Sequence, residues 1–117
     1  MLNERLLHGT MDLLLLDLLA EAPSYGYEIA QAVRTRSEGF FDLKEGALYP
    51  ALHKLERDKL LRSFWREAEG RRRKYYELTA LGRKAREKGR NTWAEFSKAV
   101  GRVLGPAQRI APDALPS

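Results

Sequence analysis

Six leucines occupy the seven positions from 13 to 19, within the segment "MDLLLLDLLAEA". Thr10 and Asp12 stand just ahead of them, and a threonine hydroxyl followed by an acid is typical of a helix N-terminus. Pro23 predicts the end of this helix, because proline interrupts the helical hydrogen bonds. The segment therefore predicts a helix that begins after Thr10 and is apolar around nearly its whole circumference.

A helix that is apolar on nearly every side must be buried on more than one side. The chain has 117 residues, enough for one compact domain, so its own core can cover one side of this helix. The other side requires a partner, and a second copy of the chain is the simplest one. We expect Leu14, Leu15 and Leu18 to lie in that dimer interface or beside an effector.

Residues 23–39, "PSYGYEIAQAVRTRSEG", predict a second helix. Ser24 is the expected N-cap, because its hydroxyl can accept from the free N–H groups of the first turn. Ile29 and Val33 form a narrow apolar stripe, which one neighbouring helix can cover. Gly39 closes the segment.

A third helix is predicted in "KEGALYPALHKLERDKLL", residues 44–61, where Leu48, Leu52 and Leu55 share one face. It contains Pro50, although proline inside a helix costs about 3 kcal/mol or more. The first four N–H groups of a helix have no acceptor within it. A start near residue 46 or 47, with an end at about residue 60, would therefore make the proline tolerable. The outer side then carries Tyr49, Pro50, His53, Lys54 and Arg57.

Residues 60–79, "LLRSFWREAEGRRRKYYELT", have the pattern of a β-hairpin with a basic tip. Aromatic residues, which strands favour, flank a polar stretch with one glycine. The turn type stays open, because neither Asn-Gly nor Asp-Gly is present. Tyr75 and Tyr76 should point to opposite faces, one packed inward and the other exposed.

A long final helix is predicted from a cap at Thr79 to roughly Leu104. Its second half repeats apolar residues at helical spacing, and a chain this short has little left to cover them. The stripe consists of Trp93, Phe96, Val100, Val103 and Leu104. We interpret it first as dimer core and second as a platform for an effector. The proline-rich residues 106–117 are expected to be a flexible tail.

Positive charge is concentrated in one part of the chain. Residues 1–43 carry three basic and seven acidic side chains, whereas residues 44–90 carry fifteen basic and seven acidic ones. This distribution is typical of a face that binds a polyanion. An ordinary solvated surface rich in lysine and arginine is the alternative.

Several classes of protein are disfavoured by the composition. The chain has no cysteine, and its histidines, His8 and His53, lie far apart, so we expect neither a metal nor another cofactor. It shows no arrangement of carboxylates, nucleophiles or phosphate-binding glycines typical of an enzyme. The leucine run is too short and too interrupted by aspartate to span a bilayer, and no signal-peptide pattern accompanies it. We expect a cytoplasmic protein without a membrane partner.

The order helix, helix, helix, hairpin and long helix predicts a mainly α fold with a small β-hairpin. This is the arrangement of a winged helix-turn-helix DNA-binding domain followed by a C-terminal dimerisation helix. The expected domain covers residues 1–79, with the wing at about 61–79. The expected dimerisation helix covers residues 80–105.

Three segments, "GTMDLLLLDLLAEAPSYGYEIAQAV", "EGALYPALHKLERDKLL" and "GRRRKYYELTALG", together resemble the PadR family of bacterial transcriptional regulators. The resemblance covers about Gly9 to Arg90, and the single helix after the hairpin resembles the compact subgroup of that family. It implies a homodimeric winged-helix repressor, with its dimer built by the first and last helices and with release by small hydrophobic or aromatic effectors. One departure is Lys59, which stands where the family commonly has glycine.

Double-stranded DNA with a palindromic operator is therefore the expected partner. The expected DNA-binding residues are Lys44, Gly46, Ala47, Tyr49, Pro50, His53, Lys54, Arg57, Arg71, Arg72 and Arg73. The expected dimer or effector residues are Leu14, Leu15, Leu18, Trp93, Phe96, Val100, Val103 and Leu104. Lys74 should contribute least of the hairpin cations, because it enters the second strand.

Some alternatives stay open at this point. Tyr49 could cap the core or donate its hydroxyl to a phosphate, and we favour the phosphate. His53 could reach a base edge or point to solvent. The rival function is a winged-helix module that binds protein. Salt-sensitive DNA binding would discriminate between the two functions.

Overall fold

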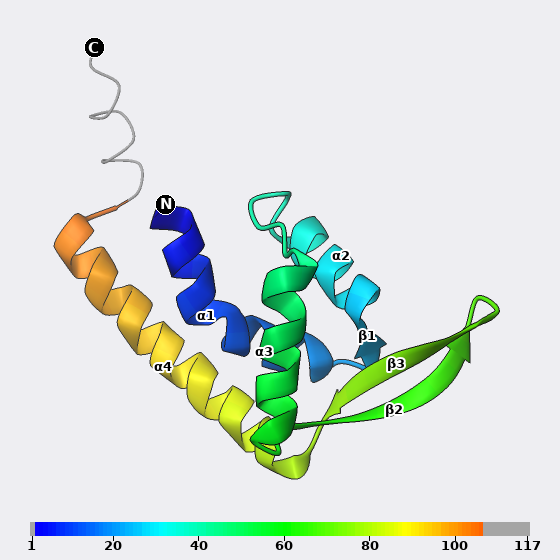
Figure 1. The fold of residues 1–117 in the computed structure, drawn as a ribbon. Helices are drawn as coiled ribbons and strands as arrows, with labels where there is room; N and C mark the ends of the chain where they lie inside the picture. Colours follow the sequence, from blue (N-terminus) through cyan, green and yellow to red (C-terminus); the bar gives the residue numbers. More distant parts are fainter. Residues whose placement is uncertain (1, 107–117) are drawn as a thin grey trace. The chain divides into compact units, whose positions relative to one another are not determined.

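The computed structural model describes residues 2–106, and the predicted tail lies outside this range apart from Pro106. The chain divides into two compact units, Met1–Arg86 and Glu87–Ser117. Its elements are α1 (Leu2–Leu19), β1 (Ser24–Tyr25), α2 (Gly26–Arg36), α3 (Glu45–Arg57), β2 (Leu61–Ala68), β3 (Arg71–Leu78) and α4 (Ala80–Leu104) (Figure 1).

The first unit combines α1, α2 and α3 with a three-stranded antiparallel sheet in the order β1-β3-β2. The β2–β3 hairpin, called the wing below, projects away from the helices in Figure 1. This arrangement is a winged helix. The predicted fold class, mainly α with a small β-hairpin, is confirmed.

The core of the first unit lies where the three helices pack on one face of the sheet. Leu15 of α1 and Leu52 of α3 are fully buried, and Ile29 of α2 and Tyr76 of β3 are nearly so. Burial of such apolar surface contributes about 25 cal/mol per Å². The expectation that Leu15 lies in a dimer interface is therefore wrong, because this leucine belongs to the core of its own chain.

α1 begins at Leu2, so the prediction that it starts after Thr10 is wrong. Thr10 lies inside the helix, where its Oγ1 donates a hydrogen bond to the carbonyl of Leu6 at 2.9 Å. Threonine makes this bond to the preceding turn within helices. Leu7 packs against the core, and that contact extends the helix ahead of the leucine-rich segment.

The two-residue strand β1 was not predicted. Ser24 and Tyr25 pair with β3, and α2 begins directly afterwards at Gly26. The N-cap of α2 is Tyr25, whose backbone N–H donates to the Glu28 carboxylate at 3.2 Å. The predicted cap at Ser24 is wrong, because that residue belongs to the sheet.

Tyr75 and Tyr76 are both buried, at 6% and 1% exposure, so the prediction that one of them is exposed is wrong. Their alternation is retained, because Tyr76 faces the core and Tyr75 faces the other side of the sheet. There the Tyr75 ring lies 5.4 Å from the ring of Tyr25 and 5.7 Å from that of Phe64. Tyr25 belongs to β1, so the unpredicted strand explains the burial of Tyr75.

α3 begins at Glu45, with Lys44 as its N-cap, slightly before the predicted start. Its backbone ladder already begins at Leu48, whose N–H donates to the Lys44 carbonyl at 2.9 Å. Pro50 therefore stands two residues inside the ladder. The explanation that its missing N–H had no helical acceptor is wrong, because the Gly46 carbonyl would accept it. Gly46 is an exposed residue, and glycine adjusts its backbone most readily to the proline ring four residues later.

α3 ends at Arg57, short of the predicted end near residue 60, in a turn where Lys59 has a φ of 68°. The N–H of Leu60 donates to the Leu55 carbonyl at 2.9 Å, and that of Lys59 donates to the Glu56 carbonyl at 3.0 Å. This pair of bonds closes a helix around a left-handed residue, which is usually glycine. The turn geometry is therefore retained although lysine stands at the glycine position.

The predicted cap of the last helix at Thr79 is confirmed. Its Oγ1 accepts from the Gly82 N–H at 3.0 Å, as an N-cap hydroxyl does for the third residue of a helix. The same hydroxyl donates to the Lys59 carbonyl at 2.7 Å. Thr79 thereby ties the start of α4 to the turn that follows α3.

Candidate nucleic-acid interface

The outward face of α3 carries most of the predicted DNA-binding residues. Leu48, Leu52 and Leu55 are buried on the opposite face and hold the helix against the core. The rest of the helix surface is thereby turned to solvent on a rigid support. The exposed predicted residues are Lys44, Gly46, Ala47, Pro50, His53, Lys54 and Arg57.

Tyr49 is half-buried and packs against the core cluster, unlike the exposed residues around it. Its hydroxyl end lies against Gly26 of α2, and its ring centre is 6.4 Å from that of His53. The side chain therefore spans the contact between α2 and α3. A phosphate contact by its hydroxyl stays a prediction.

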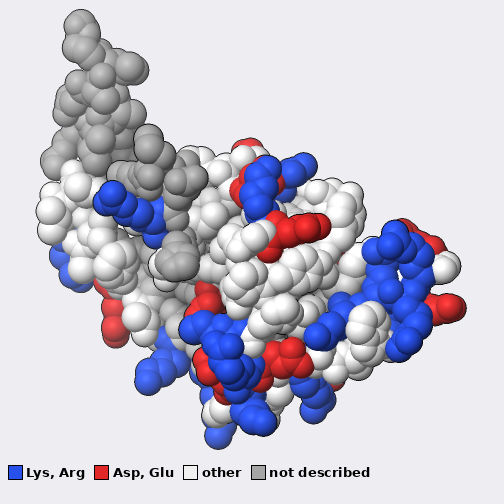
Figure 2. Space-filling model, viewed as in Figure 1, with Lys and Arg blue, Asp and Glu red and all other residues white. Residues whose placement is uncertain are grey.

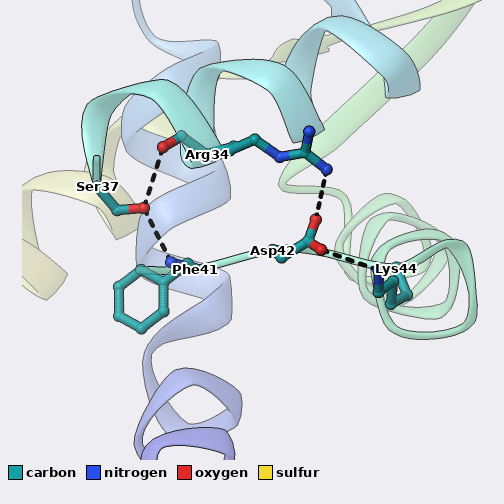
Figure 3. Close-up of polar contacts among 5 residues, drawn as sticks. All are labelled: Arg34, Ser37, Phe41, Asp42 and Lys44. Atoms are coloured by element: carbon teal, nitrogen blue, oxygen red, sulfur yellow. Dashed lines mark hydrogen bonds and ion pairs between the residues drawn. The ribbon is translucent and has the colours of Figure 1, made fainter. Parts of the chain in front are cut away.

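Asp42, in the loop before α3, joins two cations (Figure 3). Its carboxylate accepts hydrogen bonds from Arg34 Nη2 and from Lys44 Nζ, each at 2.8 Å. These bonds, that of Lys44 first, lower the pKa of Asp42 to about 2. Ser37 Oγ accepts from the Phe41 N–H at 2.9 Å and holds the same loop. Lys44 is thus tethered at the N-terminus of α3.

Lys54 connects α3 to α1. Its Nζ lies 3.1 Å from an Asp12 carboxylate oxygen and 3.8 Å from one of Asp58. Beside this ion pair, a shallow groove of about 550 Å³ separates the two helices. The groove is lined by Met11, Asp12, Gly46, Ala47, Pro50, Ala51 and Lys54.

The wing turns at Glu69 and Gly70, whose φ angles of 56° and 76° are both positive. This matches a two-residue type I′ turn, which suits the twist of a hairpin. Arg71 already belongs to β3, so entry into the strand does not distinguish Lys74 from the three arginines before it. Figure 2 shows lysine and arginine side chains gathered over the end of the wing.

Alternation along the strands divides the basic residues of the wing between two faces. Arg73 shares a face with Tyr75, and its guanidinium carbon lies 4.6 Å from the centre of the Tyr25 ring. Arg66, on the same face, lies 4.6 Å from the centre of the Tyr75 ring. The Arg73 side chain is only 23% exposed. Both arginines cover aromatic rings that join β1 to the wing, and we call this side the far face.

Arg72 and Lys74 lie on the other side of the wing together with Trp65. This is the side of the sheet from which Tyr76 packs into the core, and we call it the near face. Ser63, also on this face, donates to a Glu56 carboxylate oxygen of α3 at 2.6 Å. The near face and α3 therefore lie on the same side of the sheet.

Trp65 is a candidate contact residue that the sequence interpretation missed, and Lys74 is one that it ranked last among the hairpin cations. Their grouping with Arg72 depends on the cross-strand register, in which Trp65 lies opposite Lys74. That register follows from the turn at residues 69 and 70, and the sequence pattern left the turn type open. Knowledge of the turn would have placed both residues on the same face as Arg72.

The second unit presents the predicted apolar stripe of α4. The side chains of the stripe are exposed, from 37% for Val100 to 84% for Val103, and the ring centres of Trp93 and Phe96 lie 6.1 Å apart. In the first unit, Leu14 and Leu18 are half-buried on α1. The exposed members of the stripe are Trp93, Phe96, Val100, Val103 and Leu104.

Among the side chains that the structure describes, which exclude those of residues 1–4, 8 and 107–117, no group of three histidine, aspartate or glutamate residues could hold a metal ion. No helix in the described part of the chain is long and apolar enough to cross a membrane.

Comparison with known proteins identifies relatives over most of the chain. Residues 15–88 match the family model described as the transcriptional regulator PadR-like family. Transcriptional regulator YqjI of Escherichia coli K12 is 31% identical over 106 residues, 90% of this chain and 50% of that protein. The chain therefore spans half the length of that relative.

Two solved structures illustrate the structural likeness. A transcriptional regulator from Clostridium thermocellum is 33% identical with a TM-score of 0.78, over 84% of this chain and 96% of that one. A PadR family transcription regulator from hypervirulent Clostridium difficile is 36% identical with a TM-score of 0.71, over 82% and 99% of the two chains.

Proposed function

The chain belongs to the PadR-like family of transcriptional regulators, and from that premise we propose that it is a sequence-specific DNA-binding repressor. In this proposal it acts in the cytoplasm as a homodimer. The observation that carries the proposal is the position of two basic surfaces, the outward face of α3 and the near face of the wing, on one side of the sheet. A duplex that approaches from that side meets both.

In the proposed complex α3 enters the major groove and the wing contacts the sugar–phosphate backbone. Lys44, Lys54 and Arg57 supply phosphate contacts from α3. In the free protein the two lysines pair with Asp42 and Asp12. Exposed ion pairs of this kind contribute little to stability, so exchange of a carboxylate for a phosphate costs little.

The homodimer is supported by the exposed stripe of α4. Exposed apolar surface costs about 25 cal/mol per Å², so a patch that includes Trp93 and Phe96 favours association. A twofold dimer would bury this surface with the remaining side of α1, including Leu14 and Leu18. It would also set two copies of α3 about 34 Å apart, which matches a palindromic operator.

Release by an effector follows from the same surface. Trp93 and its copy near a twofold axis would wall an apolar cavity suited to a small hydrophobic or aromatic molecule. Such a molecule weakens DNA binding only if its affinity differs between two forms of the dimer that hold their recognition helices at different spacings. Titration of the dimer–DNA complex with planar aromatic compounds tests this element of the proposal, and unchanged DNA affinity with every compound would contradict it.

Salt dependence tests the DNA-binding element. If the dimer neutralises about six to ten phosphates, affinity for duplex DNA should fall about 10³ to 10⁵-fold between 50 and 200 mM salt. Binding that is insensitive to salt, or no binding at low salt, would instead favour a module that binds protein.

Sedimentation tests the homodimer. The wild type should sediment at about 27 kDa, twice the 13.4 kDa of the chain. Phe96→Glu combined with Val100→Glu should give a folded monomer that binds DNA poorly. A wild-type monomer at micromolar concentration would contradict the dimer and the operator geometry together.

A further inference from the structure

Trp65 is a large aromatic residue that the core does not use. Its side chain is 57% exposed, whereas Leu61 and Tyr76, on the same face of the sheet, are buried. The guanidinium carbon of Arg72 lies 5.0 Å from the centre of the indole. This is within the distance of about 6 Å at which a cation is attracted to an aromatic face. Lys74 lies directly opposite Trp65 on β3.

Arg72 has a second neighbour that competes with the indole. Glu67 lies directly opposite it across the strands, and both side chains are exposed. The ion pairs of the described residues do not include one between Arg72 and Glu67. The guanidinium therefore lies over Trp65, away from the carboxylate that would otherwise occupy its N–H groups.

We propose that Trp65 is a positioning residue for DNA binding, which holds Arg72 so that its guanidinium meets a backbone phosphate. In this arrangement the guanidinium stays over the indole while its N–H groups donate to phosphate oxygens. The near face lies on the same side of the sheet as α3, so the duplex that α3 enters is within reach of Arg72. This inference rests on the proposed DNA-binding function and names the part of the wing that carries it.

The far face supplies a matched comparison within the same strand. Arg73 differs from Arg72 by one position, carries the same charge, and is turned to the Tyr25 ring on the other side of the sheet. If the near face meets the duplex, Arg73 contributes to the stability of the wing and not to phosphate contact. Loss of the same charge at the two positions should therefore have different effects.

The experiment uses the full-length protein and a fluorescein-labelled duplex of random sequence, with anisotropy titrations at several salt concentrations. A label on the DNA keeps the readout independent of tryptophan. The variants are Arg72→Gln, Arg73→Gln, Trp65→Leu, Trp65→Phe and the double variant Trp65→Leu/Arg72→Gln. Thermal melting of each variant reports its fold.

Each phosphate that the protein neutralises makes the binding constant fall with salt concentration to the power of about 0.9. Arg72→Gln should therefore reduce affinity about fivefold at 0.15 M salt for each phosphate that the side chain no longer binds. The slope of affinity against salt should become shallower by about the same exponent. Arg73→Gln should keep the wild-type slope and lower the melting temperature. Trp65→Leu should give the same shallower salt slope as Arg72→Gln without lowering the melting temperature. Trp65→Phe should restore most of the wild-type slope.

The double variant distinguishes positioning from an independent contact. If Trp65 acts through Arg72, Trp65→Leu should have almost no further effect on affinity once Arg72 is glutamine. Additive losses would overturn the positioning role, and so would a wild-type slope for Trp65→Leu. An equal loss of slope for Arg73→Gln would overturn the assignment of the near face. If the wild type itself fails to bind the duplex, the proposed function fails, which is a separate outcome.

Discussion

The Cα atom of Gly26 in α2 lies against the hydroxyl end of the Tyr49 ring in α3, so closely that a methyl group at position 26 would overlap that ring. The contact joins α2 to α3, the two helices of the helix-turn-helix. It is made by Tyr49, the residue whose hydroxyl we predict to contact a phosphate. The absence of a side chain at position 26 thus determines where the Tyr49 hydroxyl lies.

Gly26→Ala should therefore destabilise the fold by about 1–3 kcal/mol, the usual cost of excess volume in a packed contact. DNA affinity should also fall, because Tyr49 is displaced. Urea denaturation and DNA titration measure the two effects. Gly9→Ala is the control, because a methyl group there meets no atom within 4 Å and alanine favours the helix. Equal stability changes at both positions would contradict the account of the contact.

Lys59→Gly should stabilise the protein by about 0.5–1 kcal/mol. A left-handed conformation costs a residue with a side chain about 1–2 kcal/mol, and glycine avoids this cost but loses more chain entropy on folding. Urea denaturation at one fixed protein concentration measures the change. Lys59→Ala keeps the backbone strain and removes the charge, so it should not stabilise. A gain with alanine equal to that with glycine would show that the charge, and not the backbone, is responsible.

Pro50→Ala should stabilise α3 by about 1–3 kcal/mol, because residue 50 regains an N–H for the carbonyl of Gly46. Lys54→Pro is the opposite change further along the helix and should cost about 3 kcal/mol or more. Thermal melts of both variants provide the measurement. An unchanged melting temperature for Pro50→Ala would mean that the hydrogen bond between positions 46 and 50 does not form.

Asp42→Asn tests the ion pairs at the start of α3. Lys44 and Arg34 lower the pKa of Asp42 from 3.8 to about 2 in the folded protein. A lowered pKa stabilises the fold above pH 3.8, and that stabilisation is lost as the pH falls toward 2. The difference in unfolding free energy between wild type and Asp42→Asn should therefore shrink over that interval. A difference that stays constant down to pH 2 would contradict the role of the two cations.

The regular parts of the fold could be predicted because they repeat. Leu48, Leu52 and Leu55 mark the buried side of α3, and two pairs of aromatic residues on either side of a polar, basic stretch mark the wing. β1 could not be predicted, because two residues carry no periodic signal. The burial of Tyr75 was missed for the same reason, since Tyr25 of β1 covers part of it. The start of α1 was missed because Thr10 resembles a cap, whereas its hydroxyl bonds to the preceding turn.

The sequence named basic residues for the candidate site, but it did not give their orientation. The charge run identified Arg71, Arg72 and Arg73 as a group. Strand alternation alone puts Arg72 and Arg73 on opposite faces, but only the cross-strand register shows that Arg72 shares its face with Trp65 and Ser63. That register depends on positive φ angles at Glu69 and Gly70, and such a conformation at a glutamate gives no clear signal in a single sequence.

Selection from a pool of random duplexes with the purified full-length protein tests the central claim most directly. A homodimer with α3 in the major groove should enrich an inverted repeat with half-sites about one helical turn, or 34 Å, apart. The enriched duplex should bind more tightly than the starting pool at every salt concentration. A pool that gains no common sequence after repeated rounds would contradict sequence-specific DNA recognition by this protein.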